Sequence, residues 1–164
     1  MERIVIWTVS NRAAPAAVLL ADRHYNRQKP GTPQFVPPGR CVVLLSDDAR
    51  AVWVTSWPFA EYTQHAWAGA WVNSLFRNES EYLSSDLIVQ AIAATRFYWT
   101  PPALGMITFV DASKVRSRNP GYCYKMAGFV SVGYTQGGLI ALQMKPEDMP
   151  EAEPPIGAQL ALFK

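Results

Sequence analysis

Charged residues are scarce in this sequence, and no long apolar run occurs in it. Charged side chains make up 17% of the 164 residues, against about 25% in an average soluble protein. Hydrophobic residues reach 49% and aromatic residues 12%, which excludes disorder and coiled coil for most of the chain. No stretch approaches the roughly 18–20 consecutive apolar residues of a membrane helix, and the opening residues lack the pattern of a secretory signal. We therefore expect one cytoplasmic domain with a substantial core and no membrane partner.

Cysteine and histidine are rare as well. Cys41 and Cys123 are expected to remain thiols, because a chain with this much apolar surface to bury needs no disulfide. The two histidines, His24 and His65, have no spacing to Asp111 that is typical of a metal site. We therefore expect no bound metal.

The small net charge of +2 conceals an uneven distribution. Residues 1–145 carry 14 Lys and Arg against 9 Asp and Glu, whereas the last 19 residues carry one Lys against four acidic residues. The body is therefore mildly basic and the tail acidic. A body charge of this size is compatible with a nucleic-acid partner, and equally with an enzyme that binds an anionic cofactor.

Hydrophobic periodicity predicts a mixed α/β domain rather than a doubly wound one. The order of elements is β, α, β, β, β, α, β, α, β, β, which we expect to form a mixed twisted sheet flanked by helices. The predicted strands cover residues 3–9, 41–45, 51–57, 71–77, 106–110, 129–134 and 139–144, and the predicted helices cover 13–25, 120–127 and a stretch from about 84 to the prolines at 101–102. Ser84 and Ser85 are expected to cap the central helix, and Gly128 the last one.

The segment MITFVDASKVRSRNPGYCYKMAGF combines a buried strand, a basic loop and a helix that carries Y-x-x-x-G-F at Tyr124, Gly128 and Phe129. This arrangement resembles the C-terminal half of the Gcn5-related N-acetyltransferase superfamily, which implies that fold and an acetyl-CoA or related acyl-CoA donor. In that superfamily the tyrosine hydroxyl donates a proton to the departing coenzyme A thiolate. The usual asparagine seven residues earlier is Ser117 here. The alternative is that Tyr124 is a core tyrosine with a satisfied hydroxyl.

The superfamily's Gln/Arg-x-x-Gly-x-Gly/Ala turn, which holds the pyrophosphate, is missing. In its place the strand ending in LFRNE is followed by SEYLSSDLI. The resemblance then places the pyrophosphate at the start of the central helix, with Ser84 and Ser85 in place of glycine amides and Arg77 nearby. Taken alone, the two serines are ordinary helix caps.

This departure and several short motifs between about residues 21 and 134 resemble the Mom-type phage proteins, a group within the superfamily that modifies adenine in DNA. The motifs are His24-Tyr25, the strand LFR before a serine helix, Phe109-x-Asp111 and Gly121-x-x-Tyr124. The resemblance implies functional roles for Tyr25, Asp111 and Tyr124.

Asp111 ends a central strand, where α/β sheets commonly build their sites. A carboxylate there can orient an exocyclic amine or accept its proton, which a weakly nucleophilic adenine amine requires. The alternative is that Asp111 caps the loop over residues 112–114. Asn78 and Glu79 form a second polar pair at the end of another strand.

A DNA partner would need a basic surface and a place to stack a base. Lys114, Arg116 and Arg118 lie on one loop, and His24 and Asn78 are further candidates for substrate contact. Four aromatic residues are candidates for stacking an extruded base: Trp57, Tyr62, Trp67 and Trp71. The competing interpretation is that the charges form a solvated surface and the tryptophans belong to the core.

The end of the chain differs in composition from the rest. We assign residues 1–145 to the domain, 146–158 to a Pro/Glu-rich linker that is too polar to pack, and 159–164 to a tail. The tail sequence QLALF resembles the bacterial sliding-clamp-binding pentapeptide, which implies clamp contacts by Gln159, Leu160, Leu162 and Phe163. The alternative is a short strand docked on the protein's own sheet.

These observations favour a Mom-like transferase of a phage or prophage that places a small acyl-type group on DNA bases, with the exocyclic amine of adenine as the expected target. One alternative is an acetyl-CoA-dependent N-acetyltransferase of a small amine or a protein. Another is a non-catalytic protein of the same fold that binds replication proteins. The pattern leaves the oligomeric state open.

Overall fold

The computed structural model describes residues 4–11, 13–24, 31, 39–60, 63, 65–114 and 119–158. Its elements follow the predicted order, which confirms the mixed α/β class. The strands are β1 (Trp7–Ser10), β2 (Gly39–Ser46), β3 (Ala51–Pro58), β4 (Trp71–Asn78), β5 (Met106–Val110), β6 (Val130–Tyr134) and β7 (Ile140–Met144), and the helices are α1 (Pro15–Asp22), α2 (Ser84–Tyr98) and α3 (Tyr122–Ala127). β1 begins later than predicted and α1 ends earlier, and the other boundaries lie within two residues of the predicted ones.

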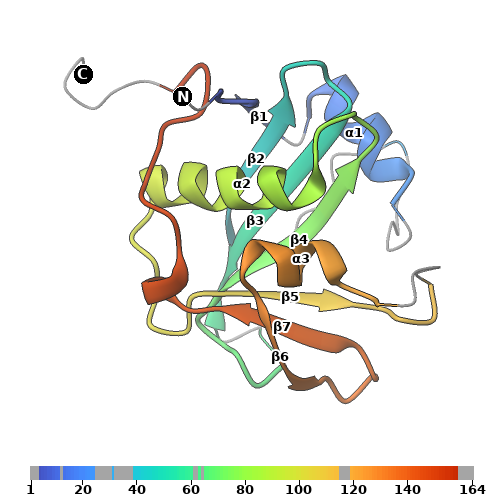
Figure 1. Cartoon of the computed structure of the whole chain (residues 1–164), viewed down its shortest axis with the longest axis vertical. Helices are drawn as coiled ribbons and strands as arrows, with labels where there is room; N and C mark the ends of the chain where they lie inside the picture. Colours follow the sequence, from blue (N-terminus) through green and yellow to red (C-terminus); the bar gives the residue numbers. More distant parts are fainter. Residues whose placement is uncertain are drawn as a thin grey trace.

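All seven strands belong to one sheet in the order β1-β2-β3-β4-β5-β7-β6 (Figure 1). Neighbouring strands are antiparallel apart from β4 and β5, which are parallel. A parallel pair needs a crossover connection, and α2 supplies it by passing over one face of the sheet. The sheet is therefore mixed, with a single parallel junction between β4 and β5.

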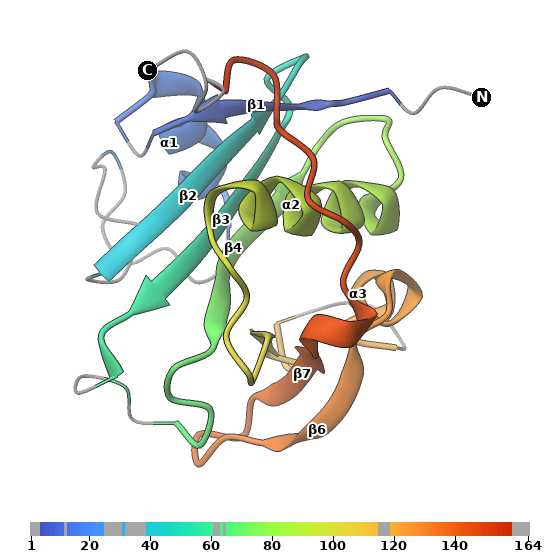
Figure 2. The ribbon, with the colours of Figure 1, turned by 90° about the vertical axis from the view of Figure 1, so that its left-hand side faces the viewer.

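Helices cover both faces of the sheet, with α2 and α3 on one side and α1 on the other (Figure 2). On the first face, Ile88 and Ile92 of α2 pack with Trp53 and Trp71 in the main core, and all four side chains have no solvent exposure. The cluster under α1 contains Ala17, Leu20, Ala21, Val43, Val52, Val54 and Leu75. Because both faces are covered, consecutive residues of β3 and β5 are buried on either side of the sheet.

The start of α2 differs from the prediction that serines cap it. The capping residue is Leu83, which makes no side-chain capping hydrogen bond, and Ser84 is already the first helical residue. Asn78, at the end of β4, donates from Nδ2 to Ser84 Oγ at 2.9 Å. The serine hydroxyl therefore joins the strand to the helix. The prediction for Gly128 is confirmed, because it ends α3 in the left-handed region with φ of 114°.

Residues 146–158, which we call the C-terminal strap, pack against the domain, so the prediction of a linker that does not pack is wrong. After the 3₁₀ helix Pro146–Asp148, the strap passes over α2 and reaches the edge strand β1 (Figure 2). There Ile156 forms a parallel bridge with Thr8. The strap therefore crosses one face of the domain from β7 to β1.

Backbone hydrogen bonds explain why so polar a segment packs. Arg96 of α2 donates to the carbonyl of Pro150 at 2.9 Å, and the amide of Glu153 donates to the carbonyl of Ala93 at 3.0 Å. Met149 adds a buried apolar side chain, 8% exposed. The composition of the strap predicted disorder because it counts apolar side chains and takes no account of backbone groups satisfied by a neighbouring helix.

Two further predictions bear on the chain as a whole. None of the helices in the described ranges is long and apolar enough to cross a membrane. Cys41 and Cys123 are free thiols, as predicted, and both are half-buried. The tail with Gln159, Leu160, Leu162 and Phe163 lies outside the described residues, so the clamp contact stays a prediction.

Candidate active site

The parallel strands β4 and β5 part after a short paired stretch. Their register holds only from Trp71 opposite Met106 to Asn73 opposite Thr108, although β4 continues to Asn78. On its other edge β4 carries a bulge, because Val54 and Thr55 of β3 face Leu75 and Asn73 and leave out Ser74. A bulge bends a strand and increases its twist. In the described sheet, the pairing of β4 with β5 therefore ends at Asn73.

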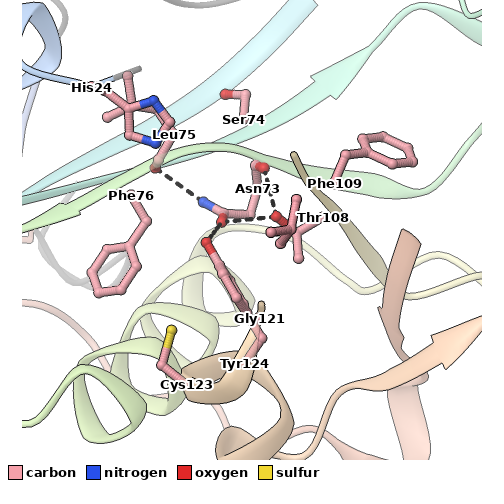
Figure 3. A pocket seen from close by; sticks show the side chains of 11 residues that line it. His24, Asn73, Ser74, Leu75, Phe76, Thr108, Phe109, Gly121, Cys123 and Tyr124 are labelled. Atoms are coloured by element: carbon pink, nitrogen blue, oxygen red, sulfur yellow. Dashed lines mark hydrogen bonds between the residues drawn. The ribbon is translucent and has the colours of Figure 1, made fainter. Parts of the chain in front are cut away.

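A cavity of about 170 Å³ lies at this point (Figure 3). Its described lining residues come from α1, β4, β5 and the region of α3: His24, Asn73, Ser74, Leu75, Phe76, Thr108, Phe109, Val110, Gly121, Cys123 and Tyr124. Ligands in open α/β sheets bind where neighbouring strands diverge at their carboxyl ends. The geometry of the sheet thus makes this cavity the candidate site.

Asn73 is the central polar residue of the cavity. Its Nδ2 donates to the carbonyls of Val54 and Leu75, both at 3.0 Å, which fixes the direction of the amide. Its Oδ1 then accepts the hydroxyl of Tyr124 at 2.5 Å, and the Thr108 hydroxyl lies 3.2 Å from the same atom. Asn73 and Thr108 are both buried. A buried side-chain amide whose donor and acceptor groups are all hydrogen-bonded is held in one orientation.

Tyr124 reaches the cavity from α3. Its ring packs edge-on against Phe76 and Phe129, with centroid distances of 6.3 and 5.4 Å. Gly121, the capping residue of α3, has φ of 79°, and a Cβ there would lie 2.6 Å from Leu142 Cδ1. Any larger residue would therefore have to adopt this positive φ and displace the buried side chain of Leu142 in β7. The hydroxyl of Tyr124 is hydrogen-bonded, as expected of a core tyrosine, and Tyr124 also lines the cavity, as expected of a proton donor.

The cavity has residues from both sides of the sheet. Tyr124 and Cys123 lie on the side of α3, whereas His24 and Phe109 lie on the opposite side of β4 (Figure 3). His24 follows the end of α1 and is half-buried. Burial raises the pKa of the Cys123 thiol and keeps it protonated. Tyr25, the neighbour of His24, lies outside the described residues.

Asp111 is placed differently from the catalytic role implied for it. Its Oδ1 accepts hydrogen bonds from the amide and the hydroxyl of Ser113, at 3.0 and 2.6 Å. These bonds, with a smaller contribution from Lys114, lower the pKa of the carboxyl group against the opposing effect of burial. Asp111 is not among the described residues that line the cavity. The structure therefore matches the alternative, in which Asp111 caps the turn after β5.

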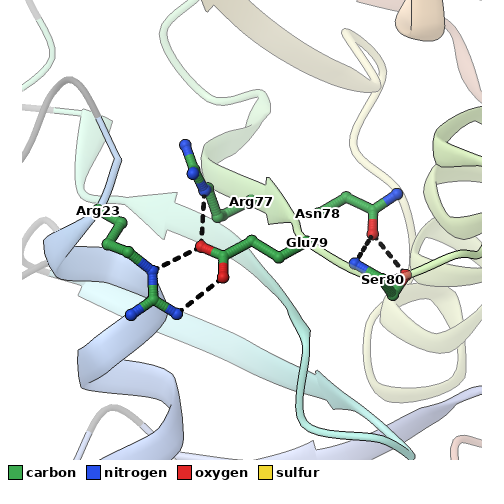
Figure 4. Close-up of polar contacts among 5 residues, drawn as sticks. All are labelled: Arg23, Arg77, Asn78, Glu79 and Ser80. Atoms are coloured by element: carbon green, nitrogen blue, oxygen red, sulfur yellow. Dashed lines mark hydrogen bonds and ion pairs between the residues drawn. The ribbon is translucent and has the colours of Figure 1, made fainter.

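The polar pair Asn78 and Glu79 also has a structural role (Figure 4). Asn78 Oδ1 accepts the amide of Ser80 at 2.9 Å, and its Nδ2 donates to the carbonyl of Tyr82 as well as to Ser84. All the polar groups of the Asn78 side chain are thus used to fold the loop between β4 and α2. Asn78 is not a described lining residue of the cavity, so the structure does not bring it to the candidate site.

Glu79 joins α1 to the end of β4. It accepts two hydrogen bonds from Arg23, at 2.6 and 2.8 Å, and one from Arg77 Nε at 3.0 Å (Figure 4). The hydrogen bonds from Arg23, followed by those from Arg77, lower the pKa of Glu79 against the effect of burial. Arg77 and Asn78 are neighbours in β4, so their side chains point to opposite faces of the sheet. Asn78 bonds to Ser84 at the start of α2, whereas Arg77 bonds to Glu79 on the side of α1. Asp86 in the first turn of α2 makes this helix end less attractive to an anion.

The predicted nucleic-acid residues are only partly described. Lys114 is exposed just beyond β5, while Arg116, Arg118 and Tyr62 lie outside the described residues. Trp71 is completely buried and packs at right angles to Trp57, so it belongs to the core and cannot stack on a base. For Trp71 the core interpretation is correct.

Comparisons with known proteins give no identity. No protein family matches the sequence, and neither curated proteins nor solved structures yield a significant match.

Within the described ranges, no group of three or more His, Cys, Asp or Glu side chains is arranged to hold a metal. The sequence prediction did not include Asn73 or Thr108. Thr108 is the one polar residue of β5, whereas Asn73 is one of several polar residues of β4 and so gives a weaker signal.

Proposed function

We propose that the protein is an acyl-CoA-dependent N-acyltransferase of the Gcn5-related type, with its transfer site in the cavity between β4 and β5. The observation that carries the proposal is the Tyr124 hydroxyl, held by Asn73 Oδ1 at 2.5 Å where the two strands part. It lies where the Y-x-x-x-G-F motif implies a proton donor.

The parted strands suit an extended donor. The described part of β5 does not pair with β4 beyond Asn73, where the cavity opens along β4. The pantetheine arm of coenzyme A carries amide groups that can pair with a strand edge, as a peptide does when it adds to a sheet. Ser84 and Ser85, at the start of α2, are the proposed contacts of the pyrophosphate.

The proposed reaction uses the two sides of the sheet for different tasks. The acceptor amine attacks the thioester carbonyl, so that a C–N bond forms and the C–S bond breaks. Tyr124 donates its proton to the departing thiolate, and the imidazole of His24, on the opposite side, accepts the proton that the amine loses. The proton released at nitrogen balances the one consumed at sulfur.

A DNA base is the proposed acceptor in a second, more specific version of this function. The observation that favours it is the position of Lys114, exposed on the turn that follows β5, which places positive charge close to the carboxyl end of a cavity strand. The remaining basic residues of that loop, Arg116 and Arg118, would extend the contact to the phosphate backbone.

The test compares Tyr124→Phe with Tyr122→Phe, a matched control on the same helix whose ring is 55% exposed. Thiol release from acetyl-CoA is measured with duplex DNA and, separately, with small amines, and the DNA is digested for nucleoside mass analysis. Tyr124→Phe is expected to lower transfer by about a hundredfold or more, whereas Tyr122→Phe leaves it unchanged. Equal rates for the two variants, or no acetyl-CoA binding by the wild type, would refute the proposal.

A further inference from the structure

The strand β6 ends the described sheet and pairs there with β7 alone (Figure 1). Val130 and Tyr134, at its two ends, are 59% and 72% exposed. Ser131 and Val132, between them, are exposed as well. Because consecutive side chains of a strand point to opposite faces, β6 is exposed on both faces and not on one side only.

The chain around β6 carries no charge. Residues 126–144, from the last turn of α3 to the end of β7, contain no Asp, Glu, Lys or Arg, in a sequence of which 17% is charged. Met126 adds a further exposed apolar side chain from α3. Solvent-exposed edge strands are normally protected by charged residues or proline, and β6 has neither. An exposed apolar surface that lacks charge is typical of the core of a protein–protein interface.

The C-terminal strap closes the opposite edge of the sheet, at β1 (Figure 2). The carbonyl of Ile156 accepts the amide of Val9 at 3.0 Å, and the amide of Ile156 donates to the carbonyl of Trp7 at 2.9 Å. In the described sheet, β6 is therefore the edge that can accept another strand. Copies that associate through a single edge stop at two and do not continue as a filament.

We infer that β6 is a dimer interface, in which a second copy of this chain lays its own β6 antiparallel to the first. The partner has to offer an unpaired strand edge, and a second copy does so. Like charges that face each other oppose association, but residues 126–144 have no charges. A standard interface takes about 800 Å² from each copy, which is less than a tenth of the 9385 Å² that the chain exposes. This inference is independent of the proposed transfer reaction.

The register of the proposed pair follows from its twofold symmetry. The pairing of β6 with β7 shifts between Ser131 and Gly133, and such a bulge increases the local twist. The backbone pairing of two copies is therefore short and centred on Val132. Val130 of each copy then lies opposite Tyr134 of the other. A β-branched side chain opposite an aromatic one stabilises a strand pair, and the symmetry supplies this contact twice.

Sedimentation velocity of the full chain over a range of concentrations tests the association. The wild type is expected to sediment with twice the mass of one chain. Val130→Arg buries an unpaired charge in the interface, so it is expected to weaken association at least tenfold. Leu19→Arg, in α1 and 58% exposed, is the matched control and should leave association unchanged.

Crosslinking tests the register, and it stays decisive if Val130→Arg disturbs folding. Opposed residues of antiparallel strands have Cα atoms about 4.5–5.5 Å apart, which a disulfide can span. Val132→Cys is therefore expected to give a disulfide between two copies under mild oxidation, whereas Leu19→Cys should not.

Three results would overturn the inference. The first is a wild type that remains monomeric at every concentration, including one that binds a different protein through β6. The second is equal association of Val130→Arg and Leu19→Arg when both are folded. The third is a rate of crosslinking for Val132→Cys that does not exceed the rate for Leu19→Cys.

Discussion

The Tyr124 hydroxyl donates a hydrogen bond to Asn73 Oδ1 at 2.5 Å, across the point at which β4 and β5 separate. Asn73 can accept it only because its Nδ2 is turned away, toward the carbonyls of Val54 and Leu75. The bulge on β4 brings those two carbonyls within reach of one amide. The position of the tyrosine hydroxyl thus depends on an irregularity in a neighbouring strand.

Replacing Asn73 should affect both stability and transfer. Asn73→Leu leaves the Tyr124 and Thr108 hydroxyls and two carbonyls without their partner, so we expect a loss of about 1–3 kcal/mol in the free energy of unfolding. Urea denaturation measures this loss. Gln136→Ala, which removes an exposed amide, should change it by less than about 0.5 kcal/mol. Equal stabilities for the two variants would contradict the role given to Asn73.

Gly121 and Gly138 offer a matched pair for measuring how tightly α3 sits on the sheet. Both have positive φ, 79° and 86°, but a Cβ at Gly138 meets nothing within 4 Å. Gly138→Ala should cost only the backbone strain, about 1–2 kcal/mol. Gly121→Ala should cost at least about 1 kcal/mol more, from the clash with Leu142, and should also lower transfer by moving Tyr124. Thermal unfolding of the two variants should show this difference. Equal losses of stability would mean that α3 or Leu142 moves to make room for the added methyl group.

Asp111→Asn separates a catalytic base from a turn cap. Asparagine keeps an oxygen that can accept the Ser113 hydrogen bonds but cannot take up a proton at neutral pH. We expect transfer to stay within about threefold of wild type, and Asp111→Ala to reduce stability through the lost turn. A loss of transfer by orders of magnitude in Asp111→Asn, with unchanged stability, would restore the catalytic role.

The C-terminal strap should contribute to stability. Met149→Ala removes a buried side chain between the strap and the core, and we expect it to lower the free energy of unfolding by about 2 kcal/mol or more. Glu151→Ala, at an exposed position of the same segment, is the control and should have little effect. Urea denaturation of both variants distinguishes a packed strap from a loose linker, for which neither substitution would matter.

The contact between Glu79 and Arg23 should make stability depend on pH in one direction. The pKa of Glu79 is lowered below its ordinary value of 4.5 in the folded protein. A group with a lowered pKa stabilises the fold above its unfolded pKa, and this contribution is lost as the pH falls through its folded pKa. The stability difference between wild type and Glu79→Gln should therefore be constant near pH 7 and should shrink as the pH falls below the ordinary value of 4.5 and through the lower pKa of the folded state. A stability difference between the two proteins that grows as the pH is lowered would contradict a lowered pKa of Glu79.

The sequence by itself determined the class of the fold and the order of its elements. Continuous apolar runs, such as those at 41–45 and 51–57, and the apolar stripe that follows Ser84 are local patterns, so each element could be located from its own residues. Gly128 was identified for the same reason, because a glycine directly after a short helix suits the left-handed conformation there. The motif around Tyr124 likewise indicated which helix carries a hydroxyl to the site.

Only the tertiary structure decided what surrounds that hydroxyl. The parting of β4 and β5, the bulge at Ser74 and the pairing of Asn73 with Tyr124 all depend on residues far apart in the sequence, and the last two residues are 51 positions apart. Such contacts leave no local periodicity in the sequence. The C-terminal strap was misjudged in the same way, since its hydrogen bonds to Ala93 and Arg96 come from a distant helix. Asp111 was assigned by its place at a strand end, but whether a carboxylate faces a cavity or its own turn depends on side-chain direction, which packing sets.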